Sequence, residues 1–154
     1  MKRVRILTVC LGNICRSPTA EAVLRRKLEV AGLGAQVDVD SAGTGSWHVG
    51  NAPDPRSRRH ALRRGYDLSA LRARCVQDAD FVRFDFILVM DEDNLADLER
   101  LKPDGAPAQL QLFASAQVPD PYQGGVEDFE RVLDLVESAS DLWIARLGQL
   151  LGTS

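Results

Sequence analysis

An α/β fold built on a parallel sheet is the arrangement that the sequence predicts. Short apolar runs typical of buried strands recur along the chain, and segments with helical periodicity separate them. No internal repeat, low-complexity tract or linker interrupts this alternation. Because 154 residues with 45% hydrophobic content can bury a substantial core, we expect one domain, residues 1–154.

Four apolar segments are predicted as strands. Residues 4–9 and 86–90 are nearly continuous apolar runs, which suit strands buried on both faces. In residues 37–40 valines alternate with aspartates, and this strand ends at Ser41. Residues 110–113 form a weaker fourth strand.

Capping residues mark the first two predicted helices. We expect Ser17 to be the N-cap of a helix whose first residue is a proline and which ends at Gly32. Asp54, also followed by a proline, is the expected N-cap of a second helix that ends at Gly65.

Two further helices are predicted at 94–101 and 126–150. The longer one carries an apolar stripe, formed by Phe129, Val132, Leu133, Val136, Trp143, Leu147 and Leu150. We therefore assign Trp143 to the core rather than to a functional site.

Composition excludes several classes of protein. A net charge of −3 disfavours a nucleic-acid partner. The apolar runs are too short for a membrane span or a signal peptide, so we expect a cytoplasmic protein without membrane association. Three cysteines do not suit a disulfide scaffold, and no second ligand pair accompanies Cys10 and Cys15, so no metal site is expected. Seven arginines crowd residues 56–74, and we interpret them as a solvated helix face.

Residues 10–18, CLGNICRSP, place a cysteine and an arginine on either side of five residues, between a strand and a helix. The backbone N–H groups of such a loop, together with the helix N-terminus, bind an oxyanion. Arg16 can bind two phosphate oxygens, and Cys10, whose thiolate form this setting favours, can attack the bound group. Gly12 permits positive φ and Asn13 tolerates it, as a loop with inward N–H groups requires.

A leaving alkoxide or phenoxide needs a proton from a second group. Asp120, which begins the turn DPYQGG, is the candidate general acid. Ligands of open α/β sheets bind beyond the carboxyl ends of the strands, where we expect Cys10, Ser41 and Asp91 to lie. Residues far apart in the sequence can therefore converge on one site.

Neighbouring residues are expected to support the loop. Ser17 both caps the helix and donates a hydrogen bond to the Cys10 sulfur, and Asn13 holds the loop through Ser17 and Ser41. Cys15 is either a thiol that protects Cys10 through a reversible disulfide or a small buried hydrophobic residue.

These motifs resemble those of the low-molecular-weight protein tyrosine phosphatase family. The matching segments, in order, are 9–18, 41–44, 47–50, 89–91 and 120–122. The resemblance implies a three-layer α/β fold, with a four-stranded parallel sheet flanked by helices on both faces. It also implies metal-free hydrolysis of phosphotyrosine without a cofactor.

The resemblance also implies residue roles. Cys10 is the nucleophile, Arg16 binds phosphate and Asp120 is the general acid. The residues implied to support the loop are Asn13, Ser17 and Ser41. The residues implied to bind substrate are Leu11, Gly12, Asn13, Ile14, Cys15, Ser17, Trp47, His48 and Tyr122.

Two positions depart from the family pattern. Leu71 stands where some members carry a histidine of the loop-supporting network, which predicts a shorter network here. Gln123 stands where many members carry a second aromatic residue, which predicts one polar wall in the pocket.

The partner implied by the resemblance is a tyrosine-phosphorylated protein, with a bacterial tyrosine kinase as one candidate, and the expected state is a monomer. Two other functions fit a loop of this kind. An arsenate reductase would need two closely spaced relay cysteines, whereas only Cys75 is present in that region. A non-catalytic phosphotyrosine-binding module would lack the nucleophile or the acid, whereas both Cys10 and Asp120 are present.

Overall fold

Four parallel strands form a sheet in the computed structural model, which describes residues 3–152. The strands are β1 (Val4–Cys10), β2 (Val37–Gly43), β3 (Phe86–Val89) and β4 (Gln109–Leu112). They are ordered β2-β1-β3-β4, and every neighbouring pair is parallel. The four predicted strands are thus confirmed, with small shifts at their ends.

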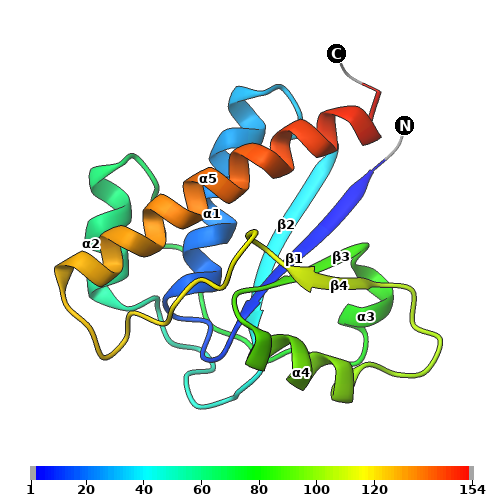
Figure 1. Ribbon diagram of the computed structural model, residues 1–154, viewed down its shortest axis with the longest axis horizontal. Helices are drawn as coiled ribbons and strands as arrows, with labels where there is room; N and C mark the ends of the chain where they lie inside the picture. The colour runs from blue at the N-terminus through cyan, green and yellow to red at the C-terminus, as the bar shows by residue number, and fades with distance from the viewer. Residues whose placement is uncertain (1–2, 153–154) are drawn as a thin grey trace.

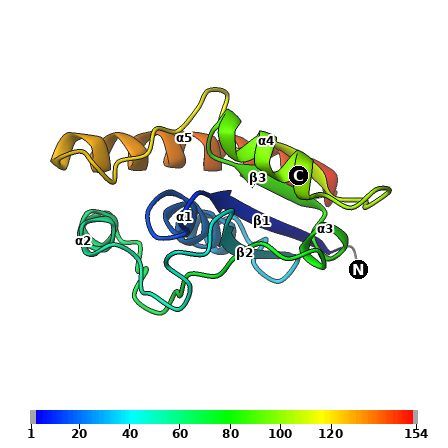
Figure 2. The same cartoon turned by 90° about the horizontal axis from the view of Figure 1, so that it is seen from below.

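Helices cover both faces of this sheet, as predicted (Figure 1). On one face lie α1 (Arg16–Val30) and α5 (Val126–Leu150). On the other face lie α3 (Asp80–Arg83) and α4 (Glu92–Leu101). The remaining helix, α2 (Pro55–Arg63), packs beside the N-terminal half of α5, away from the end where the chain starts and finishes (Figure 2).

The pairing of β1 with β2 determines what lies at the carboxyl end of the sheet. The two strands run together from the Val4–Val37 pair to the Cys10–Gly43 pair. Because β3 and β4 run in the same direction, the loops that follow all four strands emerge at this end. This is the edge at which open α/β sheets bind ligands.

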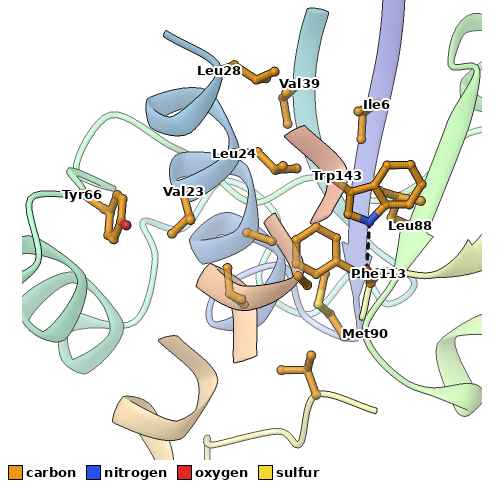
Figure 3. Packing of buried hydrophobic residues seen from close by; sticks show 14 of the residues in the cluster. Ile6, Val23, Leu24, Leu28, Val39, Tyr66, Leu88, Met90, Phe113 and Trp143 are labelled. Carbon is orange, nitrogen blue, oxygen red and sulfur yellow. Dashed lines mark hydrogen bonds between the residues drawn. The ribbon is translucent and has the colours of Figure 1, made fainter. Parts of the chain in front are cut away.

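The larger apolar core fills the space between the sheet and helices α1 and α5 (Figure 3). Ile6 and Leu88 of the sheet pack with Leu24 of α1 and Trp143 of α5. The Trp143 indole N–H donates to the carbonyl oxygen of Phe113 at 2.9 Å, which satisfies its polar atom inside the core. The assignment of Trp143 to the core is confirmed, whereas Leu150, the last residue of the predicted stripe, is exposed.

A second apolar cluster lies on the opposite face. Leu7 and Ile87 pack here against Phe81 of α3 and Leu98 of α4. Their neighbours in sequence face the first core instead. Since β1 and β3 are covered on both sides, residues 6–10 and 86–89 are all buried, which explains their nearly continuous apolar sequence.

The helices differ from the sequence predictions at α3, at the start of α4 and at the start of α1. The single turn α3 was not predicted, because four residues are too few to show a helical period. Helix α4 begins at Glu92, earlier than expected, because Asp91 is its N-cap and accepts a hydrogen bond from the Asn94 N–H at 2.8 Å. Asp54 caps α2 as predicted, accepting from the Arg56 N–H at 2.8 Å.

The prediction that Ser17 caps α1 is wrong. Helix α1 already begins at Arg16, and Cys15 occupies the N-cap position without a side-chain capping hydrogen bond to any described residue. Ser17 lies in the first turn, and its hydroxyl contacts the Cys10 sulfur instead. The backbone N–H groups at the start of α1 are therefore left for a ligand rather than for a cap.

Within residues 3–152, no helix has both the length and the apolar character needed to cross a membrane.

Candidate active site

A pocket of about 200 Å³ lies at the carboxyl end of β1. Its lining comes from the loop after β1 and from two distant loops, and consists of Cys10, Leu11, Gly12, Ile14, Cys15, Arg16, Trp47, His48, Asp120 and Tyr122. All ten belong to the set predicted from the sequence. Of the remaining predicted residues, Asn13, Ser17 and Ser41 are buried behind the pocket rather than in its lining.

Backbone hydrogen bonds determine the orientation of the 10–16 loop. Three N–H groups of the segment after β2 donate to the carbonyl oxygens of Cys10, Leu11 and Ile14, at 2.9, 2.9 and 2.8 Å. In a trans peptide the C=O and the following N–H point to opposite sides. The N–H groups that follow these three carbonyls therefore point away from that segment, as a loop that surrounds an anion requires.

Asn13 allows the sharp bend of this loop. Its φ of 57° lies in the left-handed region, and no other non-glycine residue described in the structure has a positive φ. Gly12, in contrast, does not adopt positive φ, so that part of the prediction is wrong. A Cβ at Gly12 would lie 3.0 Å from Cδ2 of His48, so a side chain there would require a small shift of the histidine ring.

Gly43 permits a close approach between β2 and the same loop. A Cβ at this position would lie 2.8 Å from the carbonyl oxygen of Leu11 and 3.2 Å from the backbone nitrogen of Asn13. Since both of these are backbone atoms, a side chain at 43 would push the loop out of its position.

A chain of buried hydrogen bonds extends from Cys10 into the protein. The Cys10 Sγ lies 3.1 Å from the Ser17 Oγ, and the Asn13 amide donates to Ser17 at 2.8 Å and to Ser41 at 3.0 Å. These are the contacts that the sequence predicted for Asn13. The Ser41 hydroxyl in turn donates to Glu21 at 2.7 Å.

Glu21 ends this chain as a buried carboxylate, which sequence reasoning missed. Burial raises the pKa of Glu21, while the hydrogen bond from Ser41 and the charge of Arg25 act in the opposite direction. Arg25 lies 2.7 Å from Glu21 at the usual i,i+4 helical spacing. That spacing, and the position of Glu21 on the inner face of α1, were the available sequence signals.

Arg16 is held in place by two acceptors. Its side chain is almost completely buried, and Nη1 donates to Asp91 at 2.6 Å and to the carbonyl oxygen of Val118 at 2.9 Å. Because Asp91 also caps α4, its carboxylate has a defined position. One side of the guanidinium is thus occupied by the protein, and the other side borders the pocket.

Asp120 reaches the pocket from the segment between β4 and α5. Its Oδ2 lies 3.7 Å from Nη2 of Arg16, and its Oδ1 accepts from the Tyr122 N–H at 3.0 Å. The Asp120 side chain is 44% exposed. A thiol, an arginine and a carboxyl group therefore meet in one pocket, although 110 positions separate Cys10 from Asp120.

The mouth of the pocket has aromatic walls. The His48 and Tyr122 rings have centroids 6.3 Å apart, and Trp47 is 72% exposed beside them. A Cβ at Gly45 would lie 1.8 Å from the Trp47 ring, so glycine is required for this placement of the indole. Such walls suit a flat aryl group.

Cys15 is buried beside Cys10 in the pocket lining, in an apolar cluster with Ala73 and Phe129. Burial raises the pKa of its thiol to about 12, although a hydrogen bond with Ser57 acts to lower it. Cys15 is therefore a neutral thiol at physiological pH. Cys75 is half-buried, and its thiol lies 3.8 Å from the Thr44 carbonyl oxygen.

The two departures from the family pattern have different outcomes. Leu71 packs against the large core, while the Asn13 side-chain oxygen accepts from the Arg74 N–H at 3.0 Å. Arg74 is itself held by Asp40 and Asp80, so the loop is supported from this side by backbone rather than by a histidine. The polar wall predicted at Gln123 is wrong, because that residue is exposed and does not line the pocket.

The described part of the chain holds no cluster of three histidine, cysteine or acidic side chains arranged for a metal ion.

Comparison with known proteins places this geometry in a family. Residues 5–151 match the family model of low molecular weight phosphotyrosine protein phosphatase. The low molecular weight phosphotyrosine protein phosphatase of Schizosaccharomyces pombe is 48% identical over 136 residues, which cover 83% of this chain and 86% of that protein. The Streptomyces coelicolor low molecular weight protein-tyrosine-phosphatase is 44% identical over 146 residues, which cover 88% of both chains. The crystal structure of a protein tyrosine phosphatase from Entamoeba histolytica, with Hepes in its active site, superposes with a TM-score of 0.91 at 38% identity, covering 95% of this chain and 97% of that one. The chain therefore belongs to the low molecular weight phosphotyrosine protein phosphatase family.

Proposed function

We propose that the protein hydrolyses phosphotyrosine through a cysteinyl-phosphate intermediate, with Cys10 as nucleophile, Arg16 as phosphate clamp and Asp120 as general acid. Protein-tyrosine phosphatase activity follows from membership of the family. The roles of individual residues rest mainly on one observation, the meeting of these three side chains in a single pocket with aromatic walls.

In the first step, the Cys10 thiolate attacks phosphorus and the bond between phosphorus and the tyrosyl oxygen breaks. Asp120 gives its proton to the leaving phenoxide. The loop N–H groups and Arg16 stabilise the charge on the three equatorial oxygens. Trp47, His48 and Tyr122 hold the aryl ring at the pocket mouth.

In the second step, water attacks the phosphocysteine. The Asp120 carboxylate accepts a proton from this water, and the bond between sulfur and phosphorus breaks to release inorganic phosphate. The Cys10 thiolate that leaves is stabilised by the Ser17 hydroxyl, 3.1 Å away. Asn13, Ser17 and Ser41 keep the loop in shape during both steps.

The direct test compares phosphotyrosyl, phosphoseryl and phosphothreonyl peptides of the same sequence, in the presence of a metal chelator. We expect hydrolysis of the phosphotyrosyl peptide alone, and an acid-quenched reaction should contain phosphate bound to Cys10 in mass spectra. Arsenate-dependent oxidation of thioredoxin would support the reductase alternative. Tight binding of the phosphotyrosyl peptide without turnover would support the binding-module alternative.

Replacement of Asp120 by asparagine tests the general acid. We expect kcat/KM to fall about 100-fold or more on phenyl phosphate, whose leaving group needs a proton. The loss should be much smaller on p-nitrophenyl phosphate, whose phenolate is a good leaving group. Equal losses on both substrates would remove Asp120 from the acid role, and Asp104→Asn, an exposed acidic position outside the pocket lining, is the matched control.

We also propose that Cys15 protects Cys10 from over-oxidation. Peroxide converts Cys10 to a sulfenic acid, and attack by the Cys15 sulfur forms a disulfide and releases water. Because the pKa of Cys15 is raised to about 12, its thiolate fraction should grow about tenfold per pH unit below that value. The disulfide should therefore form faster at pH 8 than at about pH 6.

Mass spectrometry after mild peroxide treatment measures this reaction. We expect a Cys10–Cys15 disulfide, and full recovery of activity after addition of a thiol reductant. Cys75→Ser should recover equally well, whereas Cys15→Ser should lose activity irreversibly. Sulfinic or sulfonic acid at Cys10 in the unmodified protein, without the disulfide, would contradict the protective role.

The substrates we propose are tyrosine-phosphorylated proteins of the cytoplasm, among them a bacterial tyrosine kinase. Cys10, Cys15 and Cys75 are all free thiols, which suits a reducing compartment. The monomeric state that the family resemblance implies is part of this proposal. Substrate trapping with Cys10→Ser in native lysate, followed by mass spectrometry, identifies the bound phosphoproteins.

A further inference from the structure

The arginines of residues 56–74 are not simply a solvated face, as the sequence suggested. Arg56 lies in the first turn of α2 and has a side chain only 35% exposed. Its guanidinium reaches the turn that carries Asp120, which belongs to a different part of the chain. The contacts of this side chain indicate a role in the reaction.

Arg56 holds the Asp120 turn by its backbone. Nη2 donates to the carbonyl oxygen of Tyr122 at 2.9 Å, and Nη1 approaches that of Gly124 at 3.4 Å. The guanidinium carbon lies 5.6 Å from the centre of the Tyr122 ring and 4.6 Å from that of Phe129, which is buried on α5. The turn is thus fastened between α2 and α5 on its inner side.

Asp54 holds the guanidinium in this position. Its Oδ1 accepts from the Arg56 backbone N–H at 2.8 Å and from Nε at 3.1 Å, and its Oδ2 accepts from Nη2 at 2.9 Å. Burial acts to raise the pKa of Asp54, but the hydrogen bonds and charge of Arg56 keep it below its ordinary value. The pair is therefore ionised, and its geometry is defined by several hydrogen bonds.

The same pair contacts the phosphate-binding loop. The Asp54 N–H donates to the carbonyl oxygen of Ile14 at 2.8 Å. Asp54 and Arg56 thus connect, within three residues of sequence, the loop that holds the nucleophile and the turn that holds the acid. A short series of hydrogen bonds that includes Tyr122 therefore links Asp120 to Ile14.

We propose that Arg56 is a positioning residue for the general acid, holding the Asp120 turn in register with the phosphate-binding loop. This inference rests on the proposed role of Asp120. Without Arg56, the turn loses its main side-chain contacts to α2, and the Asp120 carboxyl group spends less time within reach of the leaving oxygen. Proton donation is weakened, while phosphate binding and attack by Cys10 are preserved.

The test is a double-mutant cycle read out with two leaving groups. Arg56→Met keeps an apolar stem for packing on Phe129 but removes the hydrogen bonds, and Arg56→Lys keeps the charge without the planar fork. We expect either variant to lose about tenfold more kcat/KM on phenyl phosphate than on p-nitrophenyl phosphate. In the Asp120→Asn background, the same substitutions should cost less than about twofold on either substrate.

The matched control is Arg59→Met, at an exposed position on the same helix. It should leave kcat/KM unchanged on both substrates. Far-ultraviolet circular dichroism and thermal unfolding check that each variant is folded at the assay temperature. If Arg56→Met is not folded, Arg56→Lys alone is used for the test. Equal losses on the two substrates, or additive losses with Asp120→Asn, would overturn the inference while leaving the acid role intact. If the loss caused by Asp120→Asn did not depend on the leaving group, both the acid role of Asp120 and the positioning role of Arg56 would be contradicted.

Discussion

Cys10→Ser should abolish turnover, with kcat on p-nitrophenyl phosphate falling on the order of 10⁴-fold or more. A serine hydroxyl is protonated at neutral pH and is a much weaker nucleophile than a thiolate. The pocket should nevertheless keep its shape, because Ser17 remains bound by Asn13 at 2.8 Å and a serine at 10 can accept the same hydrogen bond.

Binding and catalysis should therefore separate in this variant. Isothermal titration with a phosphotyrosyl peptide should give an affinity close to the substrate affinity of the unmodified protein. Cys75→Ser is the matched control and should keep full activity, since Cys75 does not line the pocket. Turnover of Cys10→Ser near the normal rate would show that another group forms the covalent intermediate, or that none is formed.

Arg16→Lys should lower kcat/KM about 10³-fold, even though the positive charge is kept. Arg16 binds Asp91 at 2.6 Å and the Val118 carbonyl at 2.9 Å while another part of its fork faces the pocket. A lysine ammonium is a point charge and cannot serve these acceptors and two phosphate oxygens together. It would be drawn toward Asp91, away from the position of the transferring phosphoryl group.

Steady-state kinetics with p-nitrophenyl phosphate, together with inhibition by inorganic phosphate, measure both consequences. We expect a large fall in kcat and weaker phosphate binding, because Arg16 contacts both the ground state and the transition state. Arg26→Lys, at an exposed position of α1, should have no effect. A change in phosphate binding alone, with normal kcat, would contradict a role in stabilising the transition state.

Much of the fold was predictable because local patterns and tertiary packing agree. The continuous apolar runs of β1 and β3 are buried on both faces, and the Asp54–Pro55 pair starts α2 as expected. The predictions failed where the pattern was too short or where a side chain has another partner. The single turn α3 is an example of the first kind, and Ser17, whose hydroxyl contacts Cys10 rather than the helix start, is an example of the second.

The pocket residues were also accessible from the sequence, since Cys10 and Arg16 lie at the two ends of one loop and Asp120 begins one turn. The supporting residues were not. Glu21, Arg56 and Arg74 act through long-range contacts, and each sits in a segment whose local pattern suggests only a helix face or a loop.

The nine residues at 10–18 thus hold, in their own order, a thiol, a loop that can turn its N–H groups inward and an arginine six positions after the thiol. Asn13 and the start of α1 bend the loop locally, but hydrogen bonds from the segment after β2 set its orientation. The distance from Asp120 to Arg16 and the connection through Arg56 arise only when β1, α2 and the segment before α5 pack together. Non-local packing determines such distances, and no local pattern in the chain encodes them.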